Sequence, residues 1–442
     1  MEKNDKPHQG YTKREFLKMS GVVAGAAILP SCAHISKSIG KASLESELKR
    51  SHIEEVAKDV WMIEGYVSDS FFSRCPSSNI YILRDKADVY ILDTGFHGIY
   101  REKILSVVNR FRKDGAKRVT LLITQGHFDH AFNNDIVLET GMEWRFLLPE
   151  PEVGRTNDFS RDAIEDLERL SGYEDVFTAM LPWRWPTGMV RATGSVSHAL
   201  GWKLLKSAFS HLMDGATTLA DKAQVLKLED RIKRCFGSVE VFGWDVGPFF
   251  LIHDASHTPG HVCLYDQERK LMLAGDVTIE INPAFFYSST KRCQEVSGWL
   301  RKMSEEGFIE LAGDSHRTAT YLPSLLDKFQ IDVMHPTEAL DFMRGKDQCA
   351  AFFGFFEKYY ERLQEEVLAA HMKCGRSTVN EIVEEVRASK DPYMRGKCNL
   401  CFPELPSRLD VLVASVLREE GIAPQKEDDR IIFDPQILST MA

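Results

Sequence analysis

The sequence predicts an α/β fold, because short β-type runs alternate with an amphipathic helix and lead into polar turns. Three runs have strand character: residues 60–64, 79–83 and 89–93. Apolar residues then recur at helical spacing over residues 99–113. Residues 119–123 are a compact run of β-branched residues and leucine, which predicts a buried strand.

Length and composition describe a globular protein. The chain has 442 residues, 43% hydrophobic and 27% charged, and this length suggests about three domains. The net charge is −10, and no Lys/Arg-rich block follows the extreme N-terminus. These features disfavour a nucleic-acid partner and leave a small-molecule substrate as the expected partner. Nine widely spread cysteines do not form a disulfide scaffold in so long a chain.

Residues 1–33 predict an export signal. Basic residues around Arg14 precede a 12-residue apolar run, residues 19–30, too short to span a ~30 Å membrane core. The basic segment resembles a twin-arginine signal, with Lys13 in place of the first arginine. Residues 29–32 resemble a lipoprotein cleavage box that would attach lipid at Cys32, and ordinary cleavage near Ala33 is the alternative. Both predict a periplasmic or cell-envelope protein whose mature form has no transmembrane helix.

The remaining chain divides into two expected domains, residues 45–345 and 346–442. Residues 150–236 predict a helical insertion within the first domain, broken where prolines flank Trp183 and Trp185. These two tryptophans are candidates for an apolar substrate pocket, and core packing is the alternative. Strand-like runs resume at residues 239–242, 249–253 and 271–273. The C-terminal segment predicts helices, a capping box at residues 378–381 and a small hairpin, an order that resembles a winged helix.

Polar residues at the ends of predicted strands indicate a metal site. His127, Asp129 and His130 lie in one turn directly after the strand at residues 119–123. His257 opens a second turn, and Asp276 follows a third strand. Imidazoles and carboxylates that converge in space bind divalent metals. A single histidine would be an ordinary core or surface residue, but repeated strand-end placement favours a metal centre.

The ordered motifs resemble the metallo-β-lactamase superfamily, with a glyoxalase II-like set. That family has a His-x-His-x-Asp-His turn, a His in a Thr-Pro-Gly-His-like turn, a bridging Asp and a last His. Asp93 also resembles the Asp of the family's structural Asp-Thr-Gly element. The resemblance covers about residues 55–320. It implies an αββα sandwich with the site at one edge of the two sheets, here with the helical insertion and a mainly helical C-terminal extension.

The resemblance also assigns roles. The first metal would be bound by His127 and His257, the second by Asp129, His130 and His316, and Asp276 would bridge them. His261 would orient a ligand rather than bind the metal. Gln125 stands where the family has its first His, and its amide is a poorer zinc ligand, so one or two Zn²⁺ ions are expected. His335 is an alternative to His316 as the last ligand.

These assignments imply a metal-dependent hydrolase. A metal-bound hydroxide, held by Asp129 as the catalytic residue, would cleave an ester, thioester, lactone or lactam. One alternative is a mononuclear Fe²⁺ enzyme similar to the superfamily's persulfide dioxygenases, with His127, His257 and Asp276 as ligands. Another is a non-catalytic envelope binding protein that kept the fold.

The C-terminal segment contains residue types that predict a further zinc site. Its four ligands would be His371, Cys374, Cys398 and Cys401. The alternative is a Cys398–Cys401 disulfide or free thiols.

Overall fold

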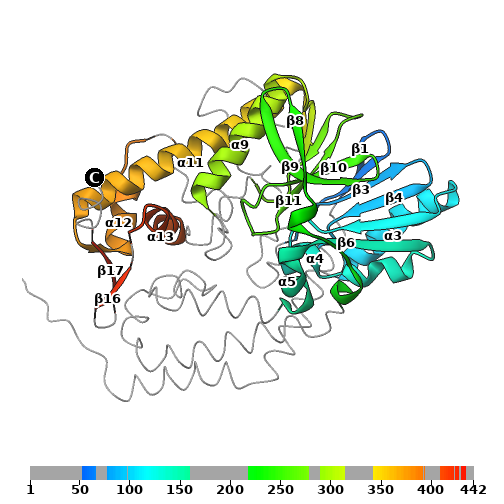
Figure 1. The fold of residues 1–442 in the computed structure, drawn as a ribbon, viewed down its shortest axis with the longest axis horizontal. Helices are drawn as coiled ribbons and strands as arrows, with labels where there is room; N and C mark the ends of the chain where they lie inside the picture. Colours follow the sequence, from blue (N-terminus) through cyan, green and yellow to red (C-terminus); the bar gives the residue numbers. More distant parts are fainter. Residues whose placement is uncertain are drawn as a thin grey trace, which may run out of the picture.

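A computed structural model describes residues 52–65, 77–96, 98–159, 218–277, 289–313, 342–391, 393, 409–422, 424–427 and 430–434. Over these residues two seven-stranded sheets stack face to face, with helices on both outer sides (Figure 1). The predicted αββα sandwich is therefore confirmed.

The first sheet contains the N-terminal strands in chain order. They are β1 (Ile53–Ala57), β2 (Val60–Ile63), β3 (Ile80–Asp85), β4 (Asp88–Leu92), β5 (Arg118–Leu122), β6 (Glu143–Pro149) and β7 (Gln224–Leu226). Strands β1 to β4 are antiparallel, whereas β4 to β7 run parallel. Helix α3 (Gly98–Lys113) is the crossover between β4 and β5. The parallel strands end at one edge, so the turns that follow them lie together.

The second sheet contains the later strands in reverse order from its far edge. They are β8 (Ile232–Phe236), β9 (Val239–Val246), β10 (Phe249–His253), β11 (Val262–Asp266), β12 (Leu271–Leu273), β13 (Leu311–Gly313) and β14 (Phe342–Arg344). Among the described strands of this sheet, only β12 and β13 pair in parallel, and helix α9 (Thr290–Glu305) lies between them in the chain. Short helices complete the part around the first sheet: α4 (Phe128–Ala131), η1 (Asn134–Glu139), η2 (Glu150–Glu152), α5 (Val153–Asn157), η3 (Ala220–Lys222) and η4 (Leu228–Asp230).

Alternating side chains divide the core into layers. In β3, Ile80 and Ile82 pack with α3, while Tyr81 and Leu83 point between the sheets. There they share a buried cluster with side chains of the second sheet such as Leu251. Both faces of each sheet are thus covered, as expected for an α/β fold whose sheets have apolar side chains on both faces.

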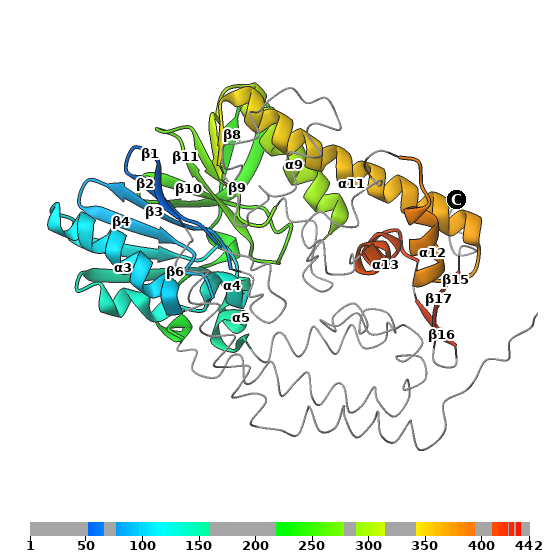
Figure 2. The same ribbon diagram turned by 180° about the vertical axis from the view of Figure 1, so that it is seen from behind.

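The C-terminal extension packs on the outer face of the second sheet. Helix α11 (Lys346–Cys374) lies alongside α9 in both ribbon views (Figures 1 and 2). Its aromatic side chains, Phe352 and Phe356 among them, join the same buried cluster as Phe250 of β10. Because α11 belongs to the core of the sandwich, the extension cannot be removed without exposing apolar surface.

The rest of the extension is small. Strand β15 (Ser377–Thr378), helices α12 (Val379–Arg387) and α13 (Leu409–Glu419), and strands β16 (Gln425–Glu427) and β17 (Arg430–Phe433) follow in order. The sheet order is β15-β17-β16. Thr378 caps α12 with the predicted capping box to Glu381. The domain boundaries, including a winged-helix domain at residues 346–442, stay a prediction.

The prediction that the helical insertion reaches residue 236 was wrong, since β7 and β8 are strands. Strand β8 pairs with β9 across the two-residue loop Gly237-Ser238, in which Gly237 takes a φ of 58°. Such a loop with a positive-φ glycine joins antiparallel strands. Strand β8 lies at the edge of its sheet and has polar residues on both faces, so it lacks the alternation of apolar and polar residues that marks a strand. The glycine turn is the sequence feature that indicates it. Trp183 and Trp185 lie outside the described residues.

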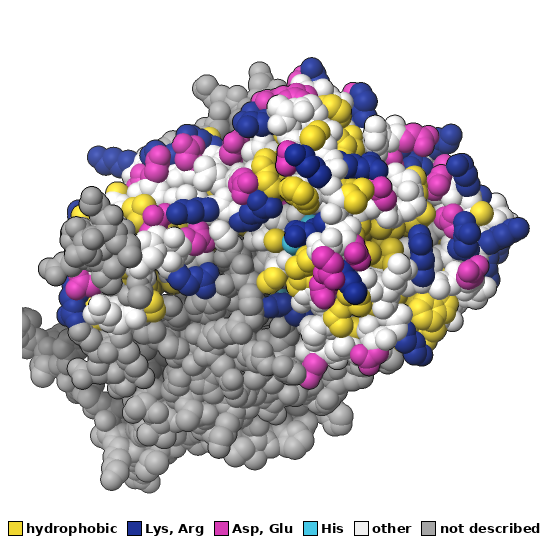
Figure 3. Space-filling view, viewed as in Figure 1, with side chains coloured by type: hydrophobic (Ala, Val, Ile, Leu, Met, Phe, Trp, Pro, Cys, Tyr) yellow, Lys and Arg dark blue, Asp and Glu magenta, His cyan; other side chains and the backbone are white. Residues whose placement is uncertain are grey.

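No helix in the described ranges is both long and apolar enough to cross a membrane. On the face shown in Figure 3, acidic and basic side chains are interspersed over the described part of the surface.

Candidate metal centre

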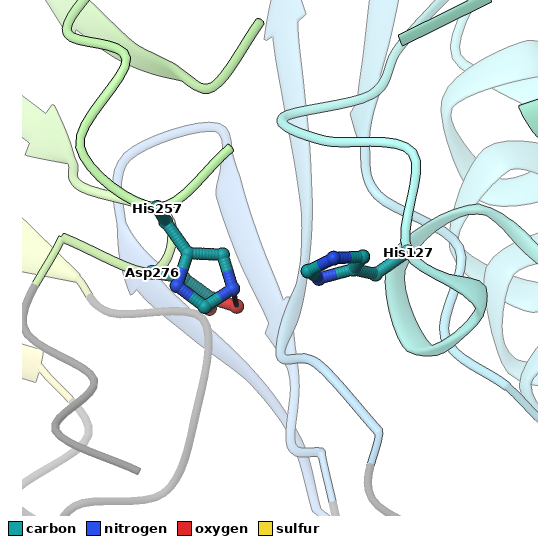
Figure 4. A group of neighbouring side chains, drawn as sticks. All are labelled: His127, His257 and Asp276. Atoms are coloured by element: carbon teal, nitrogen blue, oxygen red, sulfur yellow. Dashed lines mark ion pairs between the residues drawn. The ribbon is translucent and has the colours of Figure 1, made fainter. Parts of the chain in front are cut away.

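Three side chains of types that bind metals meet at the edge where the two sheets come together. His127 follows β5 in the first sheet, whereas His257 and Asp276 follow β10 and β12 in the second. Their ligand atoms all lie within 4.8 Å of one another. Figure 4 shows His127 facing His257 across the sheet boundary, with Asp276 beside His257. The centroids of the two imidazole rings are 5.1 Å apart and the rings nearly perpendicular, and Nε2 of His257 is 3.3 Å from Oδ2 of Asp276.

These side chains fit a divalent cation. Nε2 of His127 is buried and has no hydrogen-bond partner among the described residues. Burial, with His257 nearby, holds the pKa of His127 well below 6.5. Burial also lowers the pKa of His257 to about 4. Both imidazoles are therefore neutral at pH 7, the state that binds a metal, and a cation would satisfy the buried nitrogen.

Gln125 and His130 contact the same oxygen of Asp276, Oδ2, that His257 approaches. Nε2 of Gln125 donates to Oδ2 of Asp276 and lies 2.8 Å from Nε2 of His130. The same His130 nitrogen is 3.0 Å from Oδ2 of Asp276 and 3.8 Å from Oδ2 of Asp129. Burial opposes a charge on His130, but the carboxylates of Asp276, Asp93 and Asp129 outweigh it and hold the pKa well above 6.5.

Asp93 anchors the imidazole of His130. Its Oδ2 lies 2.8 Å from Nδ1 of His130, so that Nε2 points towards Asp276. Asp93 itself takes a φ of 63° and accepts hydrogen bonds from the backbone and hydroxyl of Thr124. The backbone N–H of Thr94 donates to the carbonyl of His130. Such supporting hydrogen bonds fix the orientation of a metal-binding imidazole.

His261 connects Asp276 to a buried carboxylate that the sequence reasoning missed. The backbone N–H of Asp276 donates to Nε2 of His261 at 2.9 Å, while Nδ1 of His261 is 2.7 Å from Oδ2 of Asp254. Asp254 also accepts from Ser256 and from the thiol of Cys263. Asp254, His261 and Cys263 form a second group with metal-ligand types. Because their polar atoms already bond to one another, this group is better suited to support Asp276.

A second missed residue, Glu152, accepts hydrogen bonds from both metal turns. Glu152 carries no local sequence signal, since its partners are distant in the chain and include two backbone N–H groups.

Several predicted site residues lie outside the described ranges. They are His316 and its alternative His335, the pocket candidates Trp183 and Trp185, the lipid-anchor residue Cys32, and the two cysteines Cys398 and Cys401. Of the C-terminal zinc candidates, His371 is buried on α11, and the thiol of Cys374 lies 3.7 Å from the carbonyl of Glu381.

Solved structures with a similar course of the chain have low sequence identity. A metallo-beta-lactamase family protein from Thermus thermophilus is 14% identical, with a TM-score of 0.47 over 86% of this chain and 100% of its own. A beta-lactamase domain protein from Burkholderia ambifaria is 15% identical, with a TM-score of 0.49 over 86% and 92%. A stereoselective inverting sec-alkylsulfatase from Pseudomonas sp. is 13% identical, with a TM-score of 0.47 over 84% of this chain and 50% of that one.

No curated protein sequence matches the chain. The family model described as the metallo-beta-lactamase superfamily, however, matches residues 74–334, which is more than half of the chain and spans both halves of the metal centre. The chain therefore belongs to the metallo-beta-lactamase superfamily.

Proposed function

We propose that this protein is a metal-dependent hydrolase of an ester, thioester, lactone or lactam, with zinc as its metal. The observation that carries the proposal is the convergence of His127, His257 and Asp276 from separate turns of the two sheets. Membership of a superfamily made up mostly of metallo-hydrolases supports it. The proposed ligands of the first metal are His127, His257 and Asp276.

The neighbouring residues are the proposed ligands of a second metal, whose binding would displace the proton that the surrounding carboxylates hold on His130. His130 lies 3.0 Å from Asp276 and 3.8 Å from Asp129, and His316 is the proposed last ligand. Gln125 already donates to the Asp276 carboxylate, so it competes with a cation for that group. We therefore expect the two positions to bind metal with unequal affinity.

A divalent cation bound by these residues would lower the pKa of a water ligand to about 7 and polarise a substrate carbonyl. In this proposal Asp129 accepts a hydrogen bond from an attacking water, and its support is a side chain that is 13% exposed and 3.8 Å from Nε2 of His130. Asp93 holds His130 in place, and the His261 contact holds the backbone of Asp276. These residues fix the geometry before a substrate binds.

The test is hydrolysis of activated esters and thioesters before and after complete metal removal. We expect chelation to abolish turnover and added zinc to restore it. Asp129→Asn should lower kcat by about 10²–10⁴-fold, the usual contribution of a general base. Undiminished turnover by metal-free protein would contradict the proposal.

A second candidate rests on the same three ligands. Two histidines and one carboxylate form the set that non-haem Fe²⁺ enzymes use to activate oxygen. This alternative predicts iron in the purified protein and oxygen uptake with a persulfide substrate. Ester hydrolysis without oxygen uptake would favour the hydrolase.

We also propose that the protein is exported to the periplasm or cell envelope, on the basis of the signal-like residues 1–33. Mass spectrometry of the mature N-terminus tests this, since lipid on Cys32 and cleavage near Ala33 give different masses. An intact N-terminus in the cytoplasmic fraction would contradict it.

A further inference from the structure

One buried carboxylate connects the two turns that carry the metal-binding histidines. Glu152 ends η2, directly after β6, and its exposed fraction is 0%. Its Oε2 accepts a hydrogen bond from the backbone N–H of Gly126 at 2.6 Å. Its Oε1 accepts from the hydroxyl of Thr258 at 2.8 Å and from the backbone N–H of Gly260 at 2.7 Å.

The three donors belong to the two halves of the metal centre. Gly126 stands between Gln125 and His127 in the turn after β5, whereas Thr258 follows His257 directly. The turns belong to different sheets and are far apart in the chain. Glu152 thus fixes the backbone beside His127 relative to the backbone beside His257.

The fit around Glu152 explains why both turns contain glycine. A Cβ on Gly260 would lie 2.7 Å from Cγ and Oε1 of Glu152. A Cβ on Gly126 would lie 2.9 Å from Oε2 of Glu152 and 2.5 Å from Cβ of Arg155. Each turn therefore approaches the carboxylate more closely than any residue with a side chain would allow.

Stability alone does not favour this arrangement. A buried carboxylate has a large desolvation cost, which its hydrogen bonds only offset. The neighbouring cation Arg155 has its Nε 4.0 Å from Oε2, at the limit of an ion pair. A neutral side chain could fill the same space at lower cost, but it could not accept three N–H and O–H donors from both turns.

We propose that Glu152 is a positioning residue of the metal centre, setting the separation of His127 and His257 and hence the affinity for the cation. This inference rests on the proposed metal site. Residues that support ligands in this way change metal affinity about 10–100-fold when replaced.

The experiment compares Glu152→Gln with Glu150→Gln in the full-length protein. Glu150 lies on the same short helix but is exposed, so its replacement controls for the loss of charge. Zinc affinity is measured by competition with a chelator, and cobalt substitution reports ligand geometry through its visible absorption. We expect Glu152→Gln to bind zinc about 10–100-fold more weakly with an altered cobalt spectrum, and Glu150→Gln to match the wild type.

Thermal unfolding of the metal-free proteins separates folding from positioning. If Glu152→Gln does not fold, Thr258→Ala replaces it, because this variant removes one donor and keeps the carboxylate bound to Gly126. Thr258→Ala should then weaken zinc binding by a smaller factor than the roughly 10–100-fold expected for Glu152→Gln.

The outcomes are distinguishable. Wild-type zinc affinity and cobalt spectrum in Glu152→Gln, or in Thr258→Ala where it takes its place, overturn the inference and leave the proposed function intact. A wild-type protein that binds no metal overturns the proposed function, and the inference with it.

Discussion

The backbone N–H of Asp276 donates a hydrogen bond to Nε2 of His261 across 2.9 Å. Since Nε2 accepts this bond, the ring proton sits on Nδ1, which faces Asp254 at 2.7 Å. The imidazole therefore transmits the position of a buried carboxylate to the backbone of a proposed metal ligand.

Asp254→Asn should weaken zinc binding about 10–100-fold, because the amide no longer fixes the His261 tautomer as a carboxylate does. Burial opposes the charge on Asp254, but His261 and Ser256 outweigh it and hold the pKa below 3.8. A lowered carboxyl pKa contributes stability that is present above the unfolded value and lost only as pH falls below it. The stability that the Asp254 carboxylate contributes should thus be present at neutral pH and be lost as the pH falls below 3.8.

The control is Asp221→Asn, at an exposed position on η3. Chelator competition and thermal unfolding at several pH values provide the measurement. An Asp254→Asn defect no larger than that of Asp221→Asn would contradict this role.

Gly275→Ala tests the close packing of His261 against the strand end. Gly275 has a φ of +59°, and a Cβ there would lie 2.5 Å from Nε2 of His261. Gly307 also has a positive φ, +79°, but a Cβ would meet nothing within 4 Å. Gly307→Ala should lower the free energy of unfolding by about 1–2 kcal/mol, because alanine is disfavoured in the left-handed backbone conformation. Gly275→Ala should lower the free energy of unfolding by more than this, measured by denaturant unfolding, and should also weaken zinc binding. Equal decreases in the two variants would show that the contact with His261 is unimportant.

Gln125→His tests the substituted ligand. Imidazole is a better zinc ligand than an amide, and the change removes the hydrogen bond that Gln125 donates to Asp276. We expect zinc at the proposed first site, beside His127 and His257, to bind more tightly than in the wild type, measured by calorimetric titration. Gln125→Ala removes the amide without adding a ligand and should give no such gain. Identical zinc titrations for Gln125→His and the wild type would contradict the assignment of this position.

Phe353→Ala tests whether α11 belongs to the core of the sandwich. Phe353 is fully buried in the cluster shared with α9 and the second sheet. Its truncation should lower the free energy of unfolding by about 3–5 kcal/mol. Met372→Ala on the same helix, where the side chain is 61% exposed, should change it by no more than about 0.5 kcal/mol. A separate, early unfolding transition in Phe353→Ala would show that the extension is independent.

The sequence predicted those elements whose signal is local. The apolar spacing of α3, the β-branched run of β5 and the capping box at Thr378 each depend on neighbouring residues, and each is present. The turns carrying His127 and His257 were found because they directly follow strands. Strand β8 was missed because its edge position leaves polar residues on both faces.

The supporting residues of the metal centre could not be predicted in this way. Glu152 acts on Gly126 and Gly260 across 26 and 108 residues of chain, mainly through backbone N–H groups. Asp254 acts on Asp276 through an intervening histidine. Almost every residue type carries the same backbone N–H group, so the sequence does not indicate which side chain accepts from it. The acceptor is identified only in the folded structure.

The most direct test of the account is the metal content of full-length protein purified without added metal, with His257→Ala in parallel. We predict one or two zinc ions per chain in the wild type and less in His257→Ala, because a proposed ligand is lost. One iron per chain, lost in His257→Ala, would instead support the oxygen-using enzyme. Absence of metal from the wild type, or a metal content that His257→Ala leaves unchanged, would contradict the proposed centre.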